Sequence, residues 1–332
     1  MIATGQASAI SNPIPGVDLG PYLRGESGAL ESLARSLRYI CENVGFFYIE
    51  NHGIPEDLID NAFSASERVH ALPVEEKNQI KLNEHNIGYM FVNESIQRHS
   101  TVEVARKPNY NESFFCVRER GPDHPDVIAN KPFRGMNLWP RDLLGFREAA
   151  LTYQGAMEQL GLSMLPAMAR ALDLPQNFFN SYFDVPYMQL RMLHYPVRDA
   201  SVPDQFGAGA HTDAGFLTFL MQRDVGGLQI RRTDGVWIDA PVLPGKFLIN
   251  TGDILRRWTN DRFLSTPHRV INEAERDRYS MAFFFGPNLD KELSALPSCH
   301  SQENPPKHDP ISYGAYKVGF VAANYSNLKP AK

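Results

Sequence analysis

Cysteine is scarce in this sequence, which contains three thiols in 332 residues. Cys41, Cys116 and Cys299 are far apart, and no two of them have the CxxC spacing of redox or zinc sites. This pattern argues against a disulfide framework, so we expect reduced cysteines and a cytoplasmic protein. Residues 1–14 also lack the basic start and the apolar core of a secretory signal peptide.

Runs of basic residues and long apolar runs are missing as well. The chain has 33 Lys and Arg residues against 38 Asp and Glu residues, a formal charge of −5, and it contains no run of five basic residues. No apolar stretch approaches the roughly 20 residues of a membrane-spanning helix. We therefore expect neither a nucleic-acid partner nor a membrane partner. Hydrophobic residues make up 43% of the chain, which is enough for a globular core.

The spacing of apolar residues changes halfway along the chain. In the first half it is helical over residues 30–44, 55–72 and 141–172, with a short apolar strand at 45–49. We expect Gly161 and Pro166 to bend or divide the last of these helices. The second half contains short apolar or alternating segments separated by Gly, Pro, Asn and Asp. These predicted strands are 188–195, 215–221, 227–231, 236–240, 246–251, 268–272 and 278–285.

This pattern predicts an α+β fold with a mainly β core. Many short strands at regular spacing indicate a double-stranded β-helix, or jelly roll, with a helical N-terminal half packed on it. We divide the chain into a mostly helical region at 1–185, a jelly-roll core at 186–290, and a C-terminal loop with a short helix at 291–332.

The first candidate functional motif is the triplet His211-Thr212-Asp213. In an extended chain, residues two apart point to the same face, so an imidazole and a carboxylate converge. His268 begins a later predicted strand and would add a second imidazole. Two His and one carboxylate form the facial triad of non-haem Fe(II) enzymes, which leaves coordination positions open. A zinc site with the same donors is an alternative, although the chain has no HExxH motif.

The second motif is Arg278-Tyr279-Ser280, at the start of an apolar strand. Arg278 and Ser280 share one face of this strand, which Ala282 and Phe284 continue. The opposite face consists of Tyr279, Met281, Phe283 and Phe285. An arginine that faces the interior requires an anion, and its forked guanidinium suits a carboxylate, with the serine as a further donor. That anion could be a ligand or an internal Asp or Glu.

Together, these motifs resemble the isopenicillin-N-synthase-like branch of the Fe(II)/2-oxoglutarate-dependent dioxygenases. Other segments are similar to the signatures of that branch, and the resemblance covers most of the chain, with the family's N-terminal segment at about 12–130. These segments are 45–54, 110–114, 226–229, Trp237 and 265–270. The resemblance implies that His211, Asp213 and His268 hold Fe(II).

The resemblance also implies a site for 2-oxoglutarate. Arg278 and Ser280 would bind its distal carboxylate, and Tyr195 would reach the same cosubstrate. Plant members carry Asn two residues before that tyrosine, whereas this chain has Leu193, so the polar contact of that Asn is absent here.

The implied activity is hydroxylation, desaturation or cyclisation of a small organic molecule, with O₂ as oxidant. It is coupled to decarboxylation of 2-oxoglutarate to succinate and CO₂. Candidate substrate contacts are Tyr89, Phe115, Arg257 and Phe285, although aromatic residues at such spacing are more often core residues and Arg257 could be a solvated surface side chain.

Two alternatives remain open at this point. One is an oxidase of the same branch that consumes O₂ without 2-oxoglutarate, since those relatives also carry the Arg-x-Ser pair. The other is a non-catalytic ligand-binding module on the same fold.

Overall fold

Two β-sheets form the centre of the computed structural model, which describes residues 14–97, 100, 102–103, 106–197, 205–271 and 275–324. The larger sheet has the strand order β1-β2-β10-β7-β12-β5-β4-β3, and the smaller has the order β6-β11-β8-β9. Strands β13 and β14 form a separate pair. The strands are β1 (Gly16–Asp18), β2 (Phe46–Glu50), β3 (Gly88–Met90), β4 (Glu112–Val117), β5 (Tyr187–Tyr195), β6 (Ala208–His211), β7 (Leu217–Gln222), β8 (Leu228–Arg231), β9 (Trp237–Asp239), β10 (Phe247–Thr251), β11 (His268–Val270), β12 (Arg278–Gly286), β13 (Glu292–Leu293) and β14 (Ile311–Ser312).

The two principal sheets face each other across a buried apolar cluster to which both contribute, including Tyr195, Ile230 and Val270. This arrangement is the predicted jelly roll, and apart from the β1–β2 pair its strands run antiparallel. Each strand expected in the second half is present within two residues at its start; Asn272, the expected end of one of them, lies outside the described residues. Strands β1, β3, β4, β6, β13 and β14 were not expected, because their short sequences lack clear alternation.

The alternation predicted for β12 is confirmed. Arg278, Ser280, Ala282 and Phe284 line an internal cavity between the sheets. Met281, Phe283 and Phe285 belong to the main core on the other side of the sheet. β12 is paired along its whole length with β5, with Arg278 opposite Tyr195. This register places the side chains of both strands on the same two faces.

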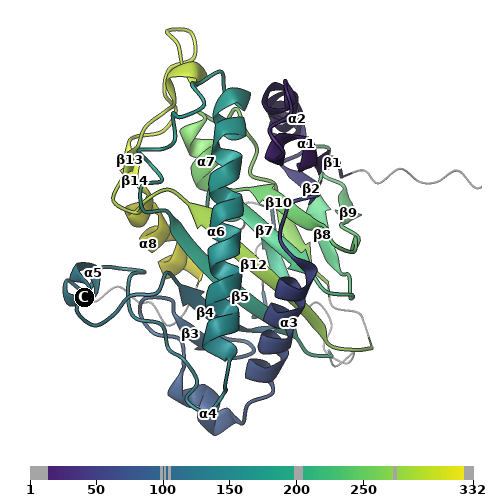
Figure 1. The fold of residues 1–332 in the computed structure, drawn as a ribbon, viewed down its shortest axis with the longest axis vertical. Coiled ribbons are helices and arrows are strands. Elements are labelled where there is room, and N and C mark those ends of the chain that lie inside the picture. Colours follow the sequence, from purple (N-terminus) through teal and green to yellow (C-terminus); the bar gives the residue numbers. More distant parts are fainter. Residues whose placement is uncertain are drawn as a thin grey trace, which may run out of the picture.

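Helices cover the outer face of the larger sheet (Figure 1). Helix α6 lies across β5 and β12, α3 packs against β4, β5 and β12, and α2 packs against α6 and β2. The helices are α1 (Gly20–Leu23), α2 (Ala29–Asn43), α3 (Glu56–His70), α4 (Val74–Gln79), α5 (Pro125–Ile128), α6 (Phe146–Ala171), α7 (Asp253–Trp258) and α8 (Tyr313–Asn324), with a 3₁₀ turn at Pro297–Cys299.

Helix α6 is one continuous helix, so the expectation that Gly161 and Pro166 divide it is wrong. Gly161 has a packing role instead. A Cβ atom at this position would lie 2.9 Å from Cδ2 of Phe285, so the absent side chain lets the helix approach β12 closely. The tertiary contact with the sheet outweighs the low helix propensity of glycine.

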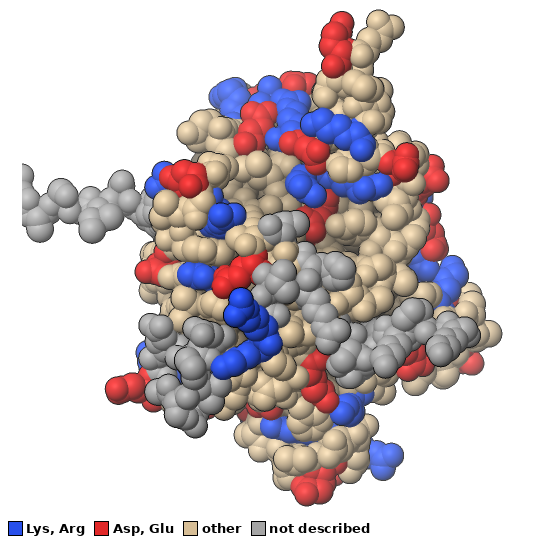
Figure 2. All heavy atoms as spheres, turned by 180° about the vertical axis from the view of Figure 1, so that it is seen from behind, with Lys and Arg blue, Asp and Glu red and all other residues tan. Residues whose placement is uncertain are grey.

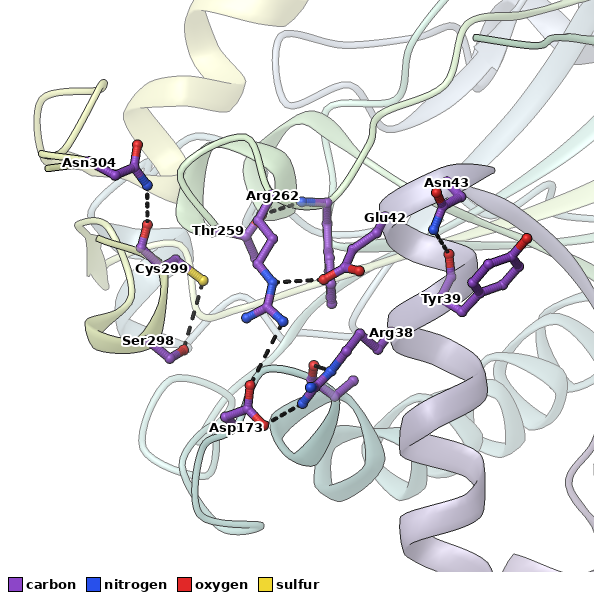
Figure 3. Close-up of polar contacts among 12 residues, drawn as sticks. Arg38, Tyr39, Glu42, Asn43, Asp173, Thr259, Arg262, Ser298, Cys299 and Asn304 are labelled. Carbon is purple, nitrogen blue, oxygen red and sulfur yellow. Dashed lines mark hydrogen bonds and ion pairs between the residues drawn. The ribbon is translucent and has the colours of Figure 1, made fainter. Parts of the chain in front are cut away.

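A network of ion pairs ties α2 to two distant segments (Figure 3). Arg262, in the loop between α7 and β11, lies 2.8 Å from Glu42 of α2 and 3.8 Å from Asp173, just after α6. Arg38 of α2 pairs with the same Asp173. Single exposed pairs contribute little, but a network that joins three segments restrains their relative positions. It therefore helps to hold the loop that leads to His268.

The surface carries charges of both signs, interspersed on the face shown in Figure 2. Among the described helices, none has the length and apolar character needed to cross a membrane. Cys41, Cys116 and Cys299 are buried and form no disulfide.

A buried polar cluster lies between α3, α4 and the larger sheet. Glu112 of β4 accepts a hydrogen bond from Nδ1 of His194 at 2.8 Å, and its other oxygen lies 3.5 Å from Lys77. Burial opposes ionisation of Glu112, but His194, Tyr89 and nearby charges lower its pKa to about 2. His70 packs 5.4 Å from His194, ring to ring. Burial, with a further contribution from His194, lowers the pKa of His70 to about 3.

We expect His70 to make the protein less stable in mild acid. Its unfolded-state pKa is near 6.5, so between that value and about 3 the unfolded chain binds more protons, and stability falls as pH falls. For His70→Gln, the slope of unfolding free energy between about pH 6.5 and 4.5 should be shallower by up to ~1.4 kcal/mol per pH unit. Urea denaturation of the metal-free wild type and variant measures both slopes. Equal slopes would contradict this assignment.

Candidate active site

Three predicted metal ligands come together at one end of the smaller sheet. His211 is the last residue of β6 and His268 the first of β11, and the two are directly opposite in the strand pairing, with ring centroids 4.3 Å apart. Asp213 Oδ1 lies 3.9 Å from Nε2 of His211 and 3.8 Å from Nε2 of His268. One ligand atom from each residue lies within 4.8 Å of the other two, which is a spacing that one metal ion can bridge.

The convergence has a different origin from the one expected. Asp213 lies in the loop after β6, not on the strand, so the two-residue period of an extended chain does not by itself align it with His211. Cross-strand pairing brings the two imidazoles together, and the loop then turns the carboxylate toward them.

Hydrogen bonds orient all three side chains. Nδ1 of His211 donates to the carbonyl of Gly209 at 2.7 Å, and Nδ1 of His268 donates to the carbonyl of Thr266 at 3.2 Å. Each imidazole therefore directs its Nε2 at the common point, and in the neutral form Nε2 is the nitrogen that is free to bind a metal. Asp213 Oδ2 accepts hydrogen bonds from Thr218 at 2.6 Å and Asn250 at 2.8 Å. Its Oδ1 remains directed at the histidines.

The protonation states also suit a metal cation. Burial, together with the nearby His268, lowers the pKa of His211 to about 4. Burial opposes ionisation of Asp213, but the two histidines and its hydrogen-bond donors lower the pKa of this carboxyl below its ordinary value. Near neutral pH, His211 is thus a neutral imidazole and Asp213 is ionised, the forms that bind a divalent metal.

The loop that carries Asp213 is held by close backbone packing. The amide of Asp253, at the start of α7, donates to the carbonyl of Asp213 at 2.7 Å. A Cβ atom on Gly252 would lie only 2.3 Å from the carbonyl oxygen of Gly215 and 2.8 Å from that of Asp213. Glycine is therefore required at position 252 for the loop to sit against α7.

Arg278 lies at the other end of the predicted site and is completely buried. Its Nη2 donates to Gln222 at 3.0 Å, its Nη1 to Ser280 at 3.3 Å, and its guanidinium carbon is 4.5 Å from the ring centre of Tyr195. Its Nε has no hydrogen-bond partner among the described residues. Burial lowers the pKa of Arg278.

No carboxylate of the described residues pairs with Arg278, so the alternative of an internal Asp or Glu partner is not supported. One cavity is lined by the His211–Asp213–His268 cluster and by Arg278, Ser280 and Tyr195. Leu193 also lines it, opposite Ser280 on the neighbouring strand. A cavity with metal donors and a separate buried cation suits a ligand that chelates a metal and carries a distal carboxylate.

The four candidate substrate contacts lie elsewhere. Tyr89 is buried beside His70, 5.6 Å between rings, and Phe285 packs against Gly161 on the helix side of the sheet. Phe115 lies beneath Arg191. Arg257 donates to the carbonyl of Asp309 at 2.6 Å and contacts His308. None of the four lines the cavities that adjoin the His211–Asp213–His268 cluster.

A second cavity adjoins the same cluster, and apart from His211 and Asp213 its lining residues were not predicted as site residues. It is lined by Asn86, Gln97, Gln189, Arg191, His211, Asp213, Ala214, Gly215, Phe284, Tyr313, Lys317, Phe320, Val321 and Asn324. Five of these come from one face of α8. Their spacing of three, four, seven and eight residues is visible in the sequence, but it does not reveal that the helix returns to cover the β core.

Comparison with known proteins identifies the protein family. The family model "2OG-Fe(II) oxygenase superfamily" matches residues 186–287, and "non-haem dioxygenase in morphine synthesis N-terminal" matches residues 14–142. The chain is 36% identical to the 2-oxoglutarate-Fe(II) type oxidoreductase hxnY of Emericella nidulans, over 93% of this chain and 91% of that protein. It is 32% identical to homoarginine-6-hydroxylase 2-ODD-233 of Oryza sativa subsp. japonica, over 86% and 87% of the two chains.

Similar solved structures support the same family. The chain is similar to a full-length Neurospora crassa protein solved in complex with alpha-KG and thymine, with a TM-score of 0.81 and 31% identity over 93% of this chain and 96% of that one. The chain therefore belongs to the 2OG-Fe(II) oxygenase superfamily. It is an oxidoreductase, a non-haem oxygenase that depends on Fe(II), 2-oxoglutarate and O₂.

Proposed function

We propose that Nε2 of His211, Oδ1 of Asp213 and Nε2 of His268 hold the iron. The donor set fits Fe(II), because two neutral imidazoles and one carboxylate leave coordination positions for other ligands. Bound iron supplies the activation of O₂ that accompanies decarboxylation of 2-oxoglutarate to succinate and CO₂. The protein's part is to fix the donors through Gly209, Thr266 and Thr218, and to enclose the site between the two sheets.

We further propose that Arg278 binds the distal carboxylate of 2-oxoglutarate, with Ser280 and Tyr195 as additional contacts. The observation that carries this assignment is a completely buried arginine without a carboxylate partner among the described residues, in the cavity that the metal cluster also lines. Leu193 offers no hydrogen bond at this end. Gln222 already accepts from Arg278 and holds the guanidinium in place.

The primary substrate that we propose is a small organic molecule, which the enzyme hydroxylates, desaturates or cyclises. A homoarginine hydroxylase and the Neurospora crassa protein bound to thymine are among the similar proteins. We assign the chain to the isopenicillin-N-synthase-like branch, on the combined match of its N-terminal and C-terminal halves. We retain the division into a helical region at 1–185, a core at 186–290 and a C-terminal segment at 291–332. Buried, unpaired cysteines support a cytoplasmic location.

An anaerobic titration tests the proposed site. Addition of Fe(II) and then 2-oxoglutarate to metal-free protein should produce a visible metal-to-ligand charge-transfer band, and a substrate screen by succinate release can follow. Iron binding without a band would contradict the 2-oxoglutarate site and favour the oxidase, which is then screened by O₂ uptake. Failure to bind iron would contradict the proposed ligand set.

A further inference from the structure

Lys317 is a buried cation without an anionic partner among the described residues. It lies on α8, is 7% exposed, and lines the cavity beside His211 and Asp213. Its ammonium lies 4.6 Å from the ring centre of Tyr187 and 5.1 Å from that of Phe133. No carboxylate of the described residues forms an ion pair with it. Burial lowers its pKa to about 8, although the charge of Asp213 opposes this shift. A buried ammonium is costly unless a ligand compensates for it.

Arg191 adds a second cation to the same cavity. Its Nε donates to Ser113 and its Nη2 to Asn111, each at 3.0 Å, and its guanidinium carbon is 4.9 Å from the ring centre of Phe115. All these partners are neutral. The hydroxyl, the amide and the ring hold the guanidinium in place without neutralising its charge.

The cavity has an excess of positive charge once the site is loaded. Asp213 is the one carboxylate among its described lining residues. Iron, Asp213, 2-oxoglutarate and Arg278 together are formally neutral. Among the described residues, the charges of Arg191 and Lys317 then remain without counterions, in a partly enclosed cavity where an anion is bound more strongly than in water.

Two buried amide oxygens of residues that line the cavity also lack hydrogen-bond partners in the described part of the chain. They are Oδ1 of Asn86 and Oδ1 of Asn324, on side chains that are 2% and 4% exposed. Nδ2 of Asn324 donates to the carbonyl of Phe320 at 3.0 Å, which orients the amide so that its oxygen is left as an acceptor. An N–H or O–H donor on a ligand would satisfy these oxygens.

We propose that Lys317 and Arg191 bind an acidic group of the primary substrate, and that this substrate is a compact, planar carboxylic acid that also carries an N–H or O–H donor. The inference rests on the proposed function of the neighbouring iron and 2-oxoglutarate site. Phe284, Tyr313 and Phe320 supply aromatic walls for a flat molecule. The inner cavity, of about 50 Å³, holds the acidic group, and the ring extends into a larger adjoining groove that shares Phe320 with it.

An outer groove adjoins this cavity. It has a volume of about 490 Å³ and shares the residues Gln97, His211, Phe320 and Asn324 with the inner cavity. The other face of α8 contributes Ala315, Tyr316 and Gly319. Helix α8 therefore contributes to both spaces, with Lys317 lining the inner cavity.

Matched pairs of neutral and anionic probes test the proposal. Benzoate and benzamide, and 4-hydroxybenzoate and 4-hydroxybenzamide, have nearly the same shape and differ in charge. Each is titrated calorimetrically into anaerobic protein loaded with Fe(II) and excess 2-oxoglutarate, which occupies the Arg278 site. We expect each carboxylate to bind at least about tenfold more tightly than its amide, and the hydroxylated pair to bind more tightly than the other.

Lys317→Met keeps the apolar stem and removes the charge, so it should weaken carboxylate binding by about tenfold or more and leave amide binding nearly unchanged. Lys317→Arg should retain the preference for the carboxylate. Lys81→Met is the matched control, because Lys81 also lies over an aromatic ring, Phe91 at 5.5 Å, but lines neither cavity. It should bind both members of each pair like the wild type.

Three outcomes would overturn the proposal: equal affinity for acid and amide, no binding of any carboxylate, or an equal loss of both in Lys317→Met. The charge-transfer band reports separately on the proposed function. If the band forms and the carboxylate preference is absent, only the substrate inference fails. If the band does not form in the wild type, the proposed iron and 2-oxoglutarate site fails, and the effect of Lys317→Met on the matched pairs still measures the substrate inference.

Discussion

Asp213→Ala is expected to abolish both iron binding and turnover. Asp213 is the one anionic donor among the three proposed ligands, and its Oδ1 faces both histidines at less than 4 Å. Without it, two neutral imidazoles remain, a donor set that holds Fe(II) weakly. The loss of affinity should exceed the roughly 10- to 100-fold that follows from removing a hydrogen-bond partner of a metal ligand. Anaerobic Fe(II) titration and succinate release measure the two losses.

Thr218→Val is expected to weaken iron binding less than Asp213→Ala does. The Thr218 hydroxyl donates to Oδ2 of Asp213 at 2.6 Å and is not one of the proposed metal ligands. The substitution should therefore lower iron affinity by about 10- to 100-fold and leave turnover measurable at high iron. Thermal unfolding of the metal-free variants controls for misfolding. Retained iron binding in a folded Asp213→Ala protein would refute the proposed ligand set.

Arg278→Met should raise the concentration of 2-oxoglutarate required for turnover on the order of a hundredfold or more, because a buried charge pair is lost. Methionine fills much of the space of the arginine stem and leaves the cavity apolar. The requirement for the primary substrate should change far less. Titration of the charge-transfer band gives the affinity directly. An unchanged 2-oxoglutarate requirement would contradict the role of Arg278.

Arg278→Met also distinguishes a role of Arg278 in ligand binding from a role in stabilising the fold. In the metal-free wild type the Arg278 charge is buried without a carboxylate partner among the described residues, so Arg278→Met should be as stable as the wild type or more stable. Millimolar 2-oxoglutarate with Fe(II) should stabilise the wild type and not the variant. Arg276→Met is the matched control: this arginine is exposed and pairs with Asp224 at the surface, and its replacement should change neither quantity.

Residue types and their local spacing made much of the β half of the chain predictable. The strand segments are recognisable because each alternates or is continuously apolar between Gly, Pro, Asn or Asp. The alternation along β12 correctly assigned Arg278 and Ser280 to the cavity face. It also placed Phe285 on the opposite face, which is where Phe285 packs against α6. A substrate role for Phe285 conflicts with this alternation.

Contacts between distant segments were not predictable in the same way. Nothing local to Gly161 and Pro166 indicates that packing against β12 keeps α6 in one piece. The short sequence of β6 gives no sign of being a strand, yet its pairing with β11 brings His211 and His268 together.

The sequence by itself determined the donor types, the strand faces and the class of chemistry, because these depend on residue identity and on the two-residue period of an extended chain. The tertiary structure alone decided which side chains surround the proposed substrate cavity. Lys317 is more than a hundred residues from His211 and Asp213 along the chain, and the packing of α8 over the β core brings them to one cavity. Such a placement depends on the free energy of burying whole elements against one another. The spacing of residues within α8 does not indicate which element the helix packs against.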